Sequence, residues 1–183
     1  WEEPQANFEK VRQLLGRTPP PPGSLIVLPE MFSTGFSFNP TATHPGTPSR
    51  VESFLQSLAQ STLCAVLGGG IGLGSGRPRN EAIAFGPDGS LLARYAKIHP
   101  FGLCQEGDHH GGGGEVVTFD WGGFRIAPLI CYDLRFPEEF RTAVEACPLP
   151  AAEEVDGFLA RLVRAAAALY VAHPEARIAY VHA

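Results

Sequence analysis

The chain has 183 residues, the length of one domain with a short appendage. Hydrophobic residues make up 44% of it and charged residues 18%, which supports a packed core and excludes wholesale disorder. The net charge of −5, without a cluster of lysine and arginine, excludes a typical nucleic-acid-binding surface. The longest strongly apolar run, Ala165 to Ala172, falls far short of the about 20 residues that cross a bilayer, so we expect no membrane segment.

The cysteines bear on the cellular compartment. Cys64, Cys104, Cys131 and Cys147 are widely spaced and form no CxxC pair. Disulfide frameworks belong to shorter, more cysteine-dense secreted chains, and no signal peptide opens this sequence. We therefore expect a reducing, cytoplasmic location.

The first half of the chain alternates helical and extended patterns. Apolar residues recur at helical spacing from Asn7 to Leu15 and from Ser49 to Ala59. Continuous apolar runs at Leu25 to Leu28 and at Leu63 to Leu67 are typical of strands that are covered on both faces. The glycine-rich stretch from Gly68 to Gly76 then predicts a flexible connection.

The second half begins with a hairpin and a loop. Glu81 to Phe85 and Leu91 to Tyr95 predict two strands, because Gly86-Pro87-Asp88-Gly89 between them is a strong turn signal. The stretch from Ile98 to Gly114 is rich in glycine and histidine and predicts a loop.

Two further strands and a helix follow. We expect the strands at Val116 to Phe119 and at Phe124 to Ile130. A helix should begin at Pro137, since proline is tolerated in the first turn and two glutamates follow it there. Strands alternating with helices predict an α/β layered domain. Beyond it, Glu153 to Ala172 predicts a long alanine-rich helix, and Ile178 to Val181 a short strand.

Glu30, Lys97 and Cys131 each stand at or just beyond the end of a predicted strand. In a parallel-type sheet, functional groups gather at the carboxyl ends of the strands, so we expect these three to meet. A cysteine beside a base and a cation is a set suited to covalent catalysis. Each residue also has a plain structural interpretation, as an inert core thiol, a turn residue or a solvated charge.

Each of these residue types suggests a role. Cys131 would attack as a thiolate, which the Lys97 ammonium and a following helix amino terminus both favour. Glu30 stands between apolar neighbours and suits a general base that takes the thiol proton. Lys97 and the backbone N–H of Tyr132 would stabilise the oxyanion formed by attack on a carbonyl or nitrile carbon.

Three motifs carry a resemblance to a known family. Leu28-Pro29-Glu30, Arg94-Tyr95-Ala96-Lys97 and the segment Cys131-Tyr132-Asp133-Leu134-Arg135-Phe136-Pro137-Glu138 resemble, in this order, the nitrilase superfamily of carbon–nitrogen hydrolases. The resemblance implies an α-β-β-α sandwich and a catalytic triad of Glu30, Lys97 and Cys131. It further implies that Glu106 is the second glutamate, which positions substrate and lysine, and that no metal or organic cofactor is required.

Within the superfamily, the segment Pro29 to Phe36 is most similar to the omega-amidase branch. Those enzymes hydrolyse the terminal amide of 2-oxoglutaramate and related 2-oxo acids through a cysteine thioester and release ammonia. Asn80 also fits the family pattern. Nitrile and N-carbamoyl hydrolases share the triad, so the acyl substrate stays open. The resemblance implies a small-molecule amide as the partner. Relatives often pair through the helices next to the nucleophile, so a homodimer is one possible assembly and the oligomeric state stays open.

The resemblance covers residues 1–146, which we interpret as a partial carbon–nitrogen hydrolase domain. The family's first strand precedes the position of Trp1, so we expect a truncated sandwich without it. Residues 147–183 show little of the family pattern, and we expect a divergent, mostly helical tail.

Three other interpretations compete with this one. Cys104, His99, His109 and His110 have zinc-compatible side chains, but no standard ligand spacing links them, so a solvated loop is preferred. The glycines from Gly68 to Gly76 contain neither dinucleotide nor P-loop spacing, which disfavours a nucleotide site. The third is an inactive fragment of such an enzyme that acts as a binding or assembly module.

Overall fold

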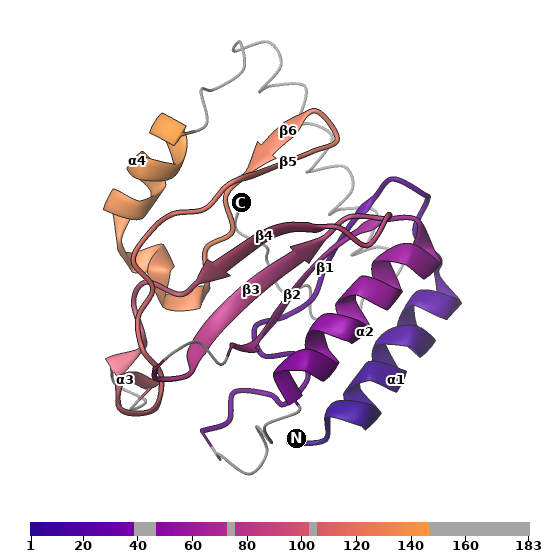
Figure 1. Cartoon of the computed structure of the whole chain (residues 1–183), viewed down its shortest axis with the longest axis horizontal. Helices are drawn as coiled ribbons and strands as arrows, with labels where there is room; N and C mark the ends of the chain where they lie inside the picture. Colours follow the sequence, from indigo (N-terminus) through magenta and orange to yellow (C-terminus); the bar gives the residue numbers. More distant parts are fainter. Residues whose placement is uncertain (39–46, 73–75, 103–105, 147–183) are drawn as a thin grey trace, which may run out of the picture.

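The computed structural model describes residues 1–38, 47–72, 76–102 and 106–146, which form a mixed sheet with helices along it (Figure 1). The sheet has four strands in the order β1 (Leu25–Val27), β2 (Ala65–Gly72), β3 (Arg79–Phe85) and β4 (Leu91–Ala96). β1 and β2 are parallel, and the two following pairs are antiparallel. The carboxyl ends of β1, β2 and β4 and the amino end of β3 therefore share one edge.

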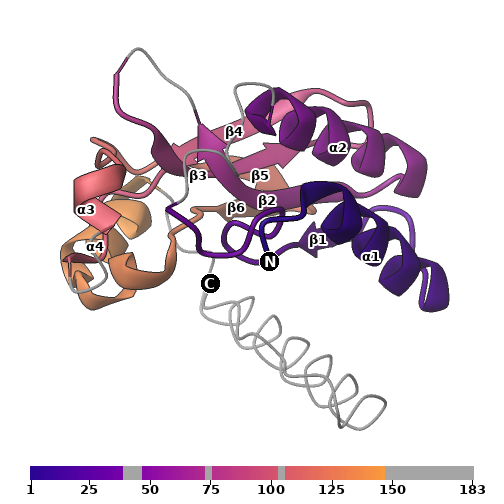
Figure 2. The same cartoon turned by 90° about the horizontal axis from the view of Figure 1, so that it is seen from below.

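Two helices pack along one face of this sheet. α1 (Pro4–Arg17) and α2 (Thr47–Thr62) lie side by side in Figures 1 and 2, and the phenyl rings of Phe8 and Phe54 stack at 4.3 Å between them. Their buried residues join Ile26, Val66 and Ile83 of the strands in one apolar core. α1 ends at Arg17, directly before the proline-rich connection that cannot continue a helix.

The opposite face of the sheet carries a second, smaller hairpin. It consists of β5 (Phe119–Trp121) and β6 (Phe124–Ile126), and Phe119 packs on Ala84 and Ala93 of the main sheet.

Three helical segments gather at the end of the sheet where β4 finishes (Figures 1 and 2). They are the short α3 (Glu106–His109), the 3-10 turn η2 (Cys131–Arg135) and α4 (Pro137–Ala146). The predicted hairpin and the helix beginning at Pro137 are confirmed.

Three local predictions are wrong. The glycines Gly68 to Gly70 continue β2 instead of forming a flexible connection, because neighbouring groups approach the strand too closely for side chains. β6 ends at Ile126 and not at Ile130, since Pro128 has no N–H for a strand ladder. The predicted loop from Ile98 to Gly114 contains α3.

The tail at 147–183, with its predicted helix and strand, lies outside the described residues. Among the residues that are described, none of the helices has the length and apolar character needed to cross a membrane.

Candidate active site

Glu30 lies in a tight turn that follows β1. The next residue, Met31, has a left-handed φ of 46°, and its side chain is completely buried. The turn is closed by the Gly35 N–H, which donates to the Met31 carbonyl at 2.8 Å. This turn presents the Glu30 carboxylate at the shared edge of the sheet, where its side chain is 22% exposed.

Lys97 follows β4 directly and is only 1% exposed. Its Nζ donates to Oε1 of Glu30 at 3.0 Å and to Oε2 of Glu106 at 2.9 Å. Burial by itself would lower the pKa of this ammonium, but the two carboxylates outweigh it, and the pKa of Lys97 is raised above its ordinary value. Lys97 is therefore a buried cation held between two anions.

Glu106 lies at the start of α3 and is completely buried. Burial opposes its ionisation, yet its pKa is lowered, because it accepts hydrogen bonds from the Phe101 N–H at 2.7 Å, from Lys97 and from Asn80. The structure thus brings both Glu30 and Glu106 into contact with Lys97. The meeting of Glu30 and Lys97 was expected from the strand ends, and the place of Glu106 beside the lysine was implied by the family resemblance.

Cys131 begins η2 with a left-handed φ of 48°, which is strained for a non-glycine residue, and its side chain is exposed. Burial raises the pKa of its thiol; the charge of Glu30 and a hydrogen bond to that carboxylate raise it further, while Lys97 lowers it. As expected, the Lys97 charge favours the thiolate, but burial and Glu30 outweigh it, so the net shift of the Cys131 pKa is upward. Burial and the neighbouring Glu30 charge therefore favour the protonated thiol.

The Cys131 turn is held by Asp133, a completely buried carboxylate. Asp133 accepts hydrogen bonds from the Ile130 N–H at 3.0 Å, from the Tyr95 hydroxyl at 2.7 Å and from the His99 N–H at 2.9 Å. Burial and the hydrogen bond to Asp133 raise the pKa of Tyr95, so it stays a neutral donor. Sequence reasoning gave Asp133 and Tyr95 no role of their own.

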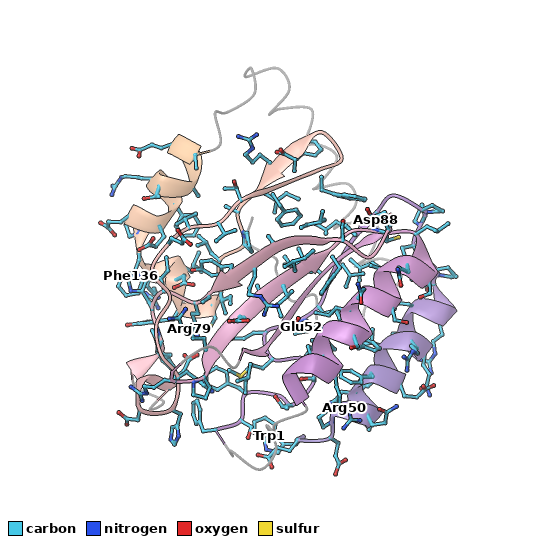
Figure 3. All side chains as sticks on the ribbon, viewed as in Figure 1. Trp1, Arg50, Glu52, Arg79, Asp88 and Phe136 are labelled. Carbon is cyan, nitrogen blue, oxygen red and sulfur yellow. The ribbon has the colours of Figure 1, made fainter. Side chains whose placement is uncertain are left out.

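Tyr132 is the second residue of η2, where N–H groups have no partner within the helical turn. Its ring packs against Phe101, with centroids 4.8 Å apart, and edge-on against Phe136 at 5.3 Å. The ring of Phe36 lies 5.6 Å from the Lys97 ammonium. Phe136 and Arg79, which starts β3, lie at this end of the sheet (Figure 3).

Asn80 matched the family pattern in the sequence but was given no role there. It is 1% exposed, and its Nδ2 donates to Oε1 of Glu30 at 2.6 Å and to Oε1 of Glu106 at 2.9 Å. Asn80 comes at the amino end of β3, and because β3 is antiparallel to its neighbours, this end lies at the same edge as Glu30 and Lys97. The hairpin predicted from the sequence could have shown this position, because it makes β3 antiparallel to β4 and so places Asn80 at the same end of the sheet as Lys97.

Two histidines near the site, His99 and His110, are packed against other groups and not solvated as the predicted loop implied. His110 is buried, and burial lowers its pKa. His99 stacks on Phe136 with centroids 3.5 Å apart and contacts Glu139 at 3.0 Å. Cys104 lies outside the described residues, and within the described ranges no three histidine, cysteine, aspartate or glutamate side chains are arranged to hold a metal ion.

Comparison with known proteins agrees with the motifs and the sheet. The family model described as "Carbon-nitrogen hydrolase" matches residues 1–147. This chain belongs to the carbon–nitrogen hydrolase family. It is 37% identical over 138 residues to the omega-amidase YafV of Yersinia enterocolitica, covering 75% of this chain and 52% of that protein. An omega-amidase of Homo sapiens is 33% identical over 124 residues, and this match covers 62% of this chain and 45% of the human protein. The chain spans about half the length of these relatives.

Solved structures show the same architecture. XC1258 from Xanthomonas campestris, described as a CN-hydrolase superfamily protein with an arsenic adduct in its active site, has a TM-score of 0.68 and 29% identity; the match covers 75% of this chain and 51% of that one. A mutant of an amidase from Nesterenkonia has a TM-score of 0.69 and 22% sequence identity. The match covers 79% of this chain and 57% of that one, and it supports the fold alone. The α/β nitrilase-like fold expected from the sequence is therefore confirmed, and the family member stands close to the omega-amidases.

Proposed function

We propose that this protein is an amidase that hydrolyses the terminal amide of a small 2-oxo acid such as 2-oxoglutaramate, with Cys131 as nucleophile. The observation that carries the proposal is the buried Lys97, which contacts both Glu30 and Glu106. The charge of the same Glu30 acts on the Cys131 thiol and raises its pKa. The similarity to omega-amidases over three quarters of the chain supports the choice of substrate.

The first step forms a thioester. Glu30 takes the thiol proton as the Cys131 sulfur attacks the amide carbon, and the carbonyl electrons move to oxygen. Nζ–H of Lys97 and the Tyr132 N–H stabilise this oxyanion. When the oxyanion collapses, the carbon–nitrogen bond breaks, Glu30 gives its proton to the leaving nitrogen, and ammonia departs.

The second step regenerates the enzyme. Glu30 takes a proton from water as the water oxygen attacks the thioester carbon. The carbon–sulfur bond then breaks, the acid product leaves, and the proton returns to the Cys131 sulfur. The sum is one amide and one water converted to one acid and one ammonia. The raised pKa of Cys131 fits this scheme, because the proton is transferred as the sulfur attacks and not beforehand.

Lys97 is suited to the oxyanion role by its geometry. Its ammonium has three N–H donors, of which two point to Glu30 and Glu106. The third donor is the one that a developing negative charge on the substrate would use. Because Lys97 is almost completely buried, water weakens that interaction little. A working thiol of this kind also supports our proposal of a reducing, cytoplasmic location.

The test is ammonia release from 2-oxoglutaramate by the wild-type chain and by two cysteine variants. We expect Cys131→Ala to abolish release and Cys64→Ala to retain it, because Cys64 is a buried core thiol that contacts backbone carbonyls away from the site. Hydroxylamine should trap the acyl group as a hydroxamate only when Cys131 is present. If the folded protein releases no ammonia from 2-oxoglutaramate, the proposal is refuted and the inactive binding module is favoured. If ammonia is released only from nitriles or N-carbamoyl compounds, the substrate belongs to one of those classes instead.

A further inference from the structure

Asn80 makes three contacts inside the site, and each goes to a different acidic or basic residue. The two N–H groups of its side-chain amide donate to Glu30 at 2.6 Å and to Glu106 at 2.9 Å. Its backbone carbonyl accepts the N–H of Lys97 at 2.8 Å. One residue thus holds both carboxylates by its side chain and the lysine by its main chain.

The charges of this cluster explain why a neutral amide suits position 80. Glu30 and Glu106 share a single ammonium, so the cluster has one more negative charge than positive charge, and the two carboxylates repel each other at close range. A neutral amide between them supplies a donor to each anion without adding a charge or a titratable proton. A lysine or arginine at position 80 would add a second cation beside Glu30, next to Lys97, and would reduce the ability of this carboxylate to take a proton.

The geometry also orients the base. Asn80 and Lys97 both donate to the same oxygen of Glu30, Oε1. Both donors bind Oε1, so neither of them occupies Oε2, the second proton acceptor of the Glu30 carboxylate. Asn80 is 1% exposed, so this orientation is fixed by packing as well as by hydrogen bonds.

We propose that Asn80 is a positioning residue that holds Glu30 and Glu106 on one amide and turns Glu30 toward Cys131. It acts through the two glutamates and does not touch the reacting atoms. This inference rests on the proposed function for its kinetic consequences, but the structural linkage that it describes can be measured without any substrate.

The experiment uses two variants of the full chain. Asn80→Leu keeps the approximate size and removes both donors, and Asn80→Asp keeps the shape and replaces the donor by an acceptor. The control is Gln56→Leu, which removes a side-chain amide bonded to the Gly89 carbonyl at 2.8 Å, on α2 and away from the carboxylates. Circular dichroism selects folded variants.

The first readout is the titration of the Glu106 carboxyl carbon by ¹³C NMR, assigned with Glu106→Gln. Asn80 is one of three donors that lower the pKa of Glu106, so we expect Asn80→Leu to raise it by about one unit. Asn80→Asp should raise it further, because a third carboxylate then faces the pair. Gln56→Leu should not change it.

The second readout is the kinetics of amide hydrolysis. Because Asn80 holds catalytic groups and not substrate, we expect kcat to fall about 10- to 100-fold in Asn80→Leu while KM stays within about threefold. A folded Asn80 variant with unchanged Glu106 titration and unchanged kcat would overturn the inference. If the wild type hydrolyses no amide, the proposed function fails, and the titration alone still decides the role of Asn80.

Discussion

Gly69 of β2 lies against the backbone of Glu30, so closely that no side chain fits between them. A Cβ atom built on Gly69 would stand 2.8 Å from Cα of Glu30 and 2.6 Å from the backbone nitrogen of Met31. Real Cβ atoms essentially never come this close to backbone, and backbone is the part that yields least. The glycine in the strand therefore allows the Glu30 turn that follows β1 to lie directly against β2.

Gly69→Ala should displace that turn. We expect a loss of about 1–3 kcal/mol in the free energy of unfolding, the usual cost of overpacking, together with a large loss of amide hydrolysis. Urea unfolding and ammonia release measure the two effects. Gly16→Ala is the matched control, since its added methyl meets nothing within 4 Å and alanine favours the α1 helix. Equal activity in the two variants would show that the close approach at Gly69 does not position Glu30.

Glu30→Gln should make the Cys131 thiol easier to ionise. Burial and the negative charge of Glu30 raise the pKa of Cys131 and the positive charge of Lys97 lowers it, so removing the Glu30 charge should lower the pKa of the thiol. We expect alkylation by iodoacetamide at pH 8 to become about three- to tenfold faster while amide hydrolysis is lost. Peptide mass spectrometry separates Cys131 from the other thiols, and the buried Cys64 reports that the fold is intact. Slower alkylation in Glu30→Gln would contradict the electrostatics described here.

Glu106 should contribute to the acid sensitivity of the fold. Its pKa in the folded chain lies below its ordinary value of 4.5, so its stabilising contribution is complete above about pH 4.5 and disappears as the pH falls through the folded value. Glu106→Gln should therefore lower the melting temperature at pH 7 and flatten its decline below pH 4.5. The exposed Glu138 on α4 provides the control, because Glu138→Gln should leave this profile unchanged. Parallel profiles for wild type and Glu106→Gln would refute the prediction.

Tyr95→Phe tests the support beneath the Cys131 turn. The variant removes the 2.7 Å hydrogen bond to Asp133 and leaves a completely buried carboxylate with one donor fewer. We expect a loss of about 1–3 kcal/mol in the free energy of unfolding. Ser61→Ala, which removes an exposed hydroxyl bonded to the Leu58 carbonyl, should cost less than about 0.5 kcal/mol. Equal costs in urea unfolding would show that Asp133 does not depend on Tyr95.

The sequence by itself determined the elements that depend on neighbouring residues. The turn Gly86-Pro87-Asp88-Gly89 fixed the hairpin, Pro137 fixed the start of α4, and the motifs around Glu30, Lys97 and Cys131 identified the family. These features follow from backbone chemistry and from short patterns, which a linear reading contains.

Only the tertiary structure decided how the site works. Asn80 bonds Glu30 from 50 positions away, and Tyr95 bonds Asp133 beside the Cys131 turn from 38 positions away. Gly69 pairs with β3, and the backbone of Glu30 and Met31 lies too close to it for a side chain. The raised pKa of Cys131 likewise results from burial and from the charge of Glu30, which together outweigh the opposite effect of Lys97. Burial, close approach and summed charge depend on groups that the folded chain brings together, so no local pattern in the sequence specifies them.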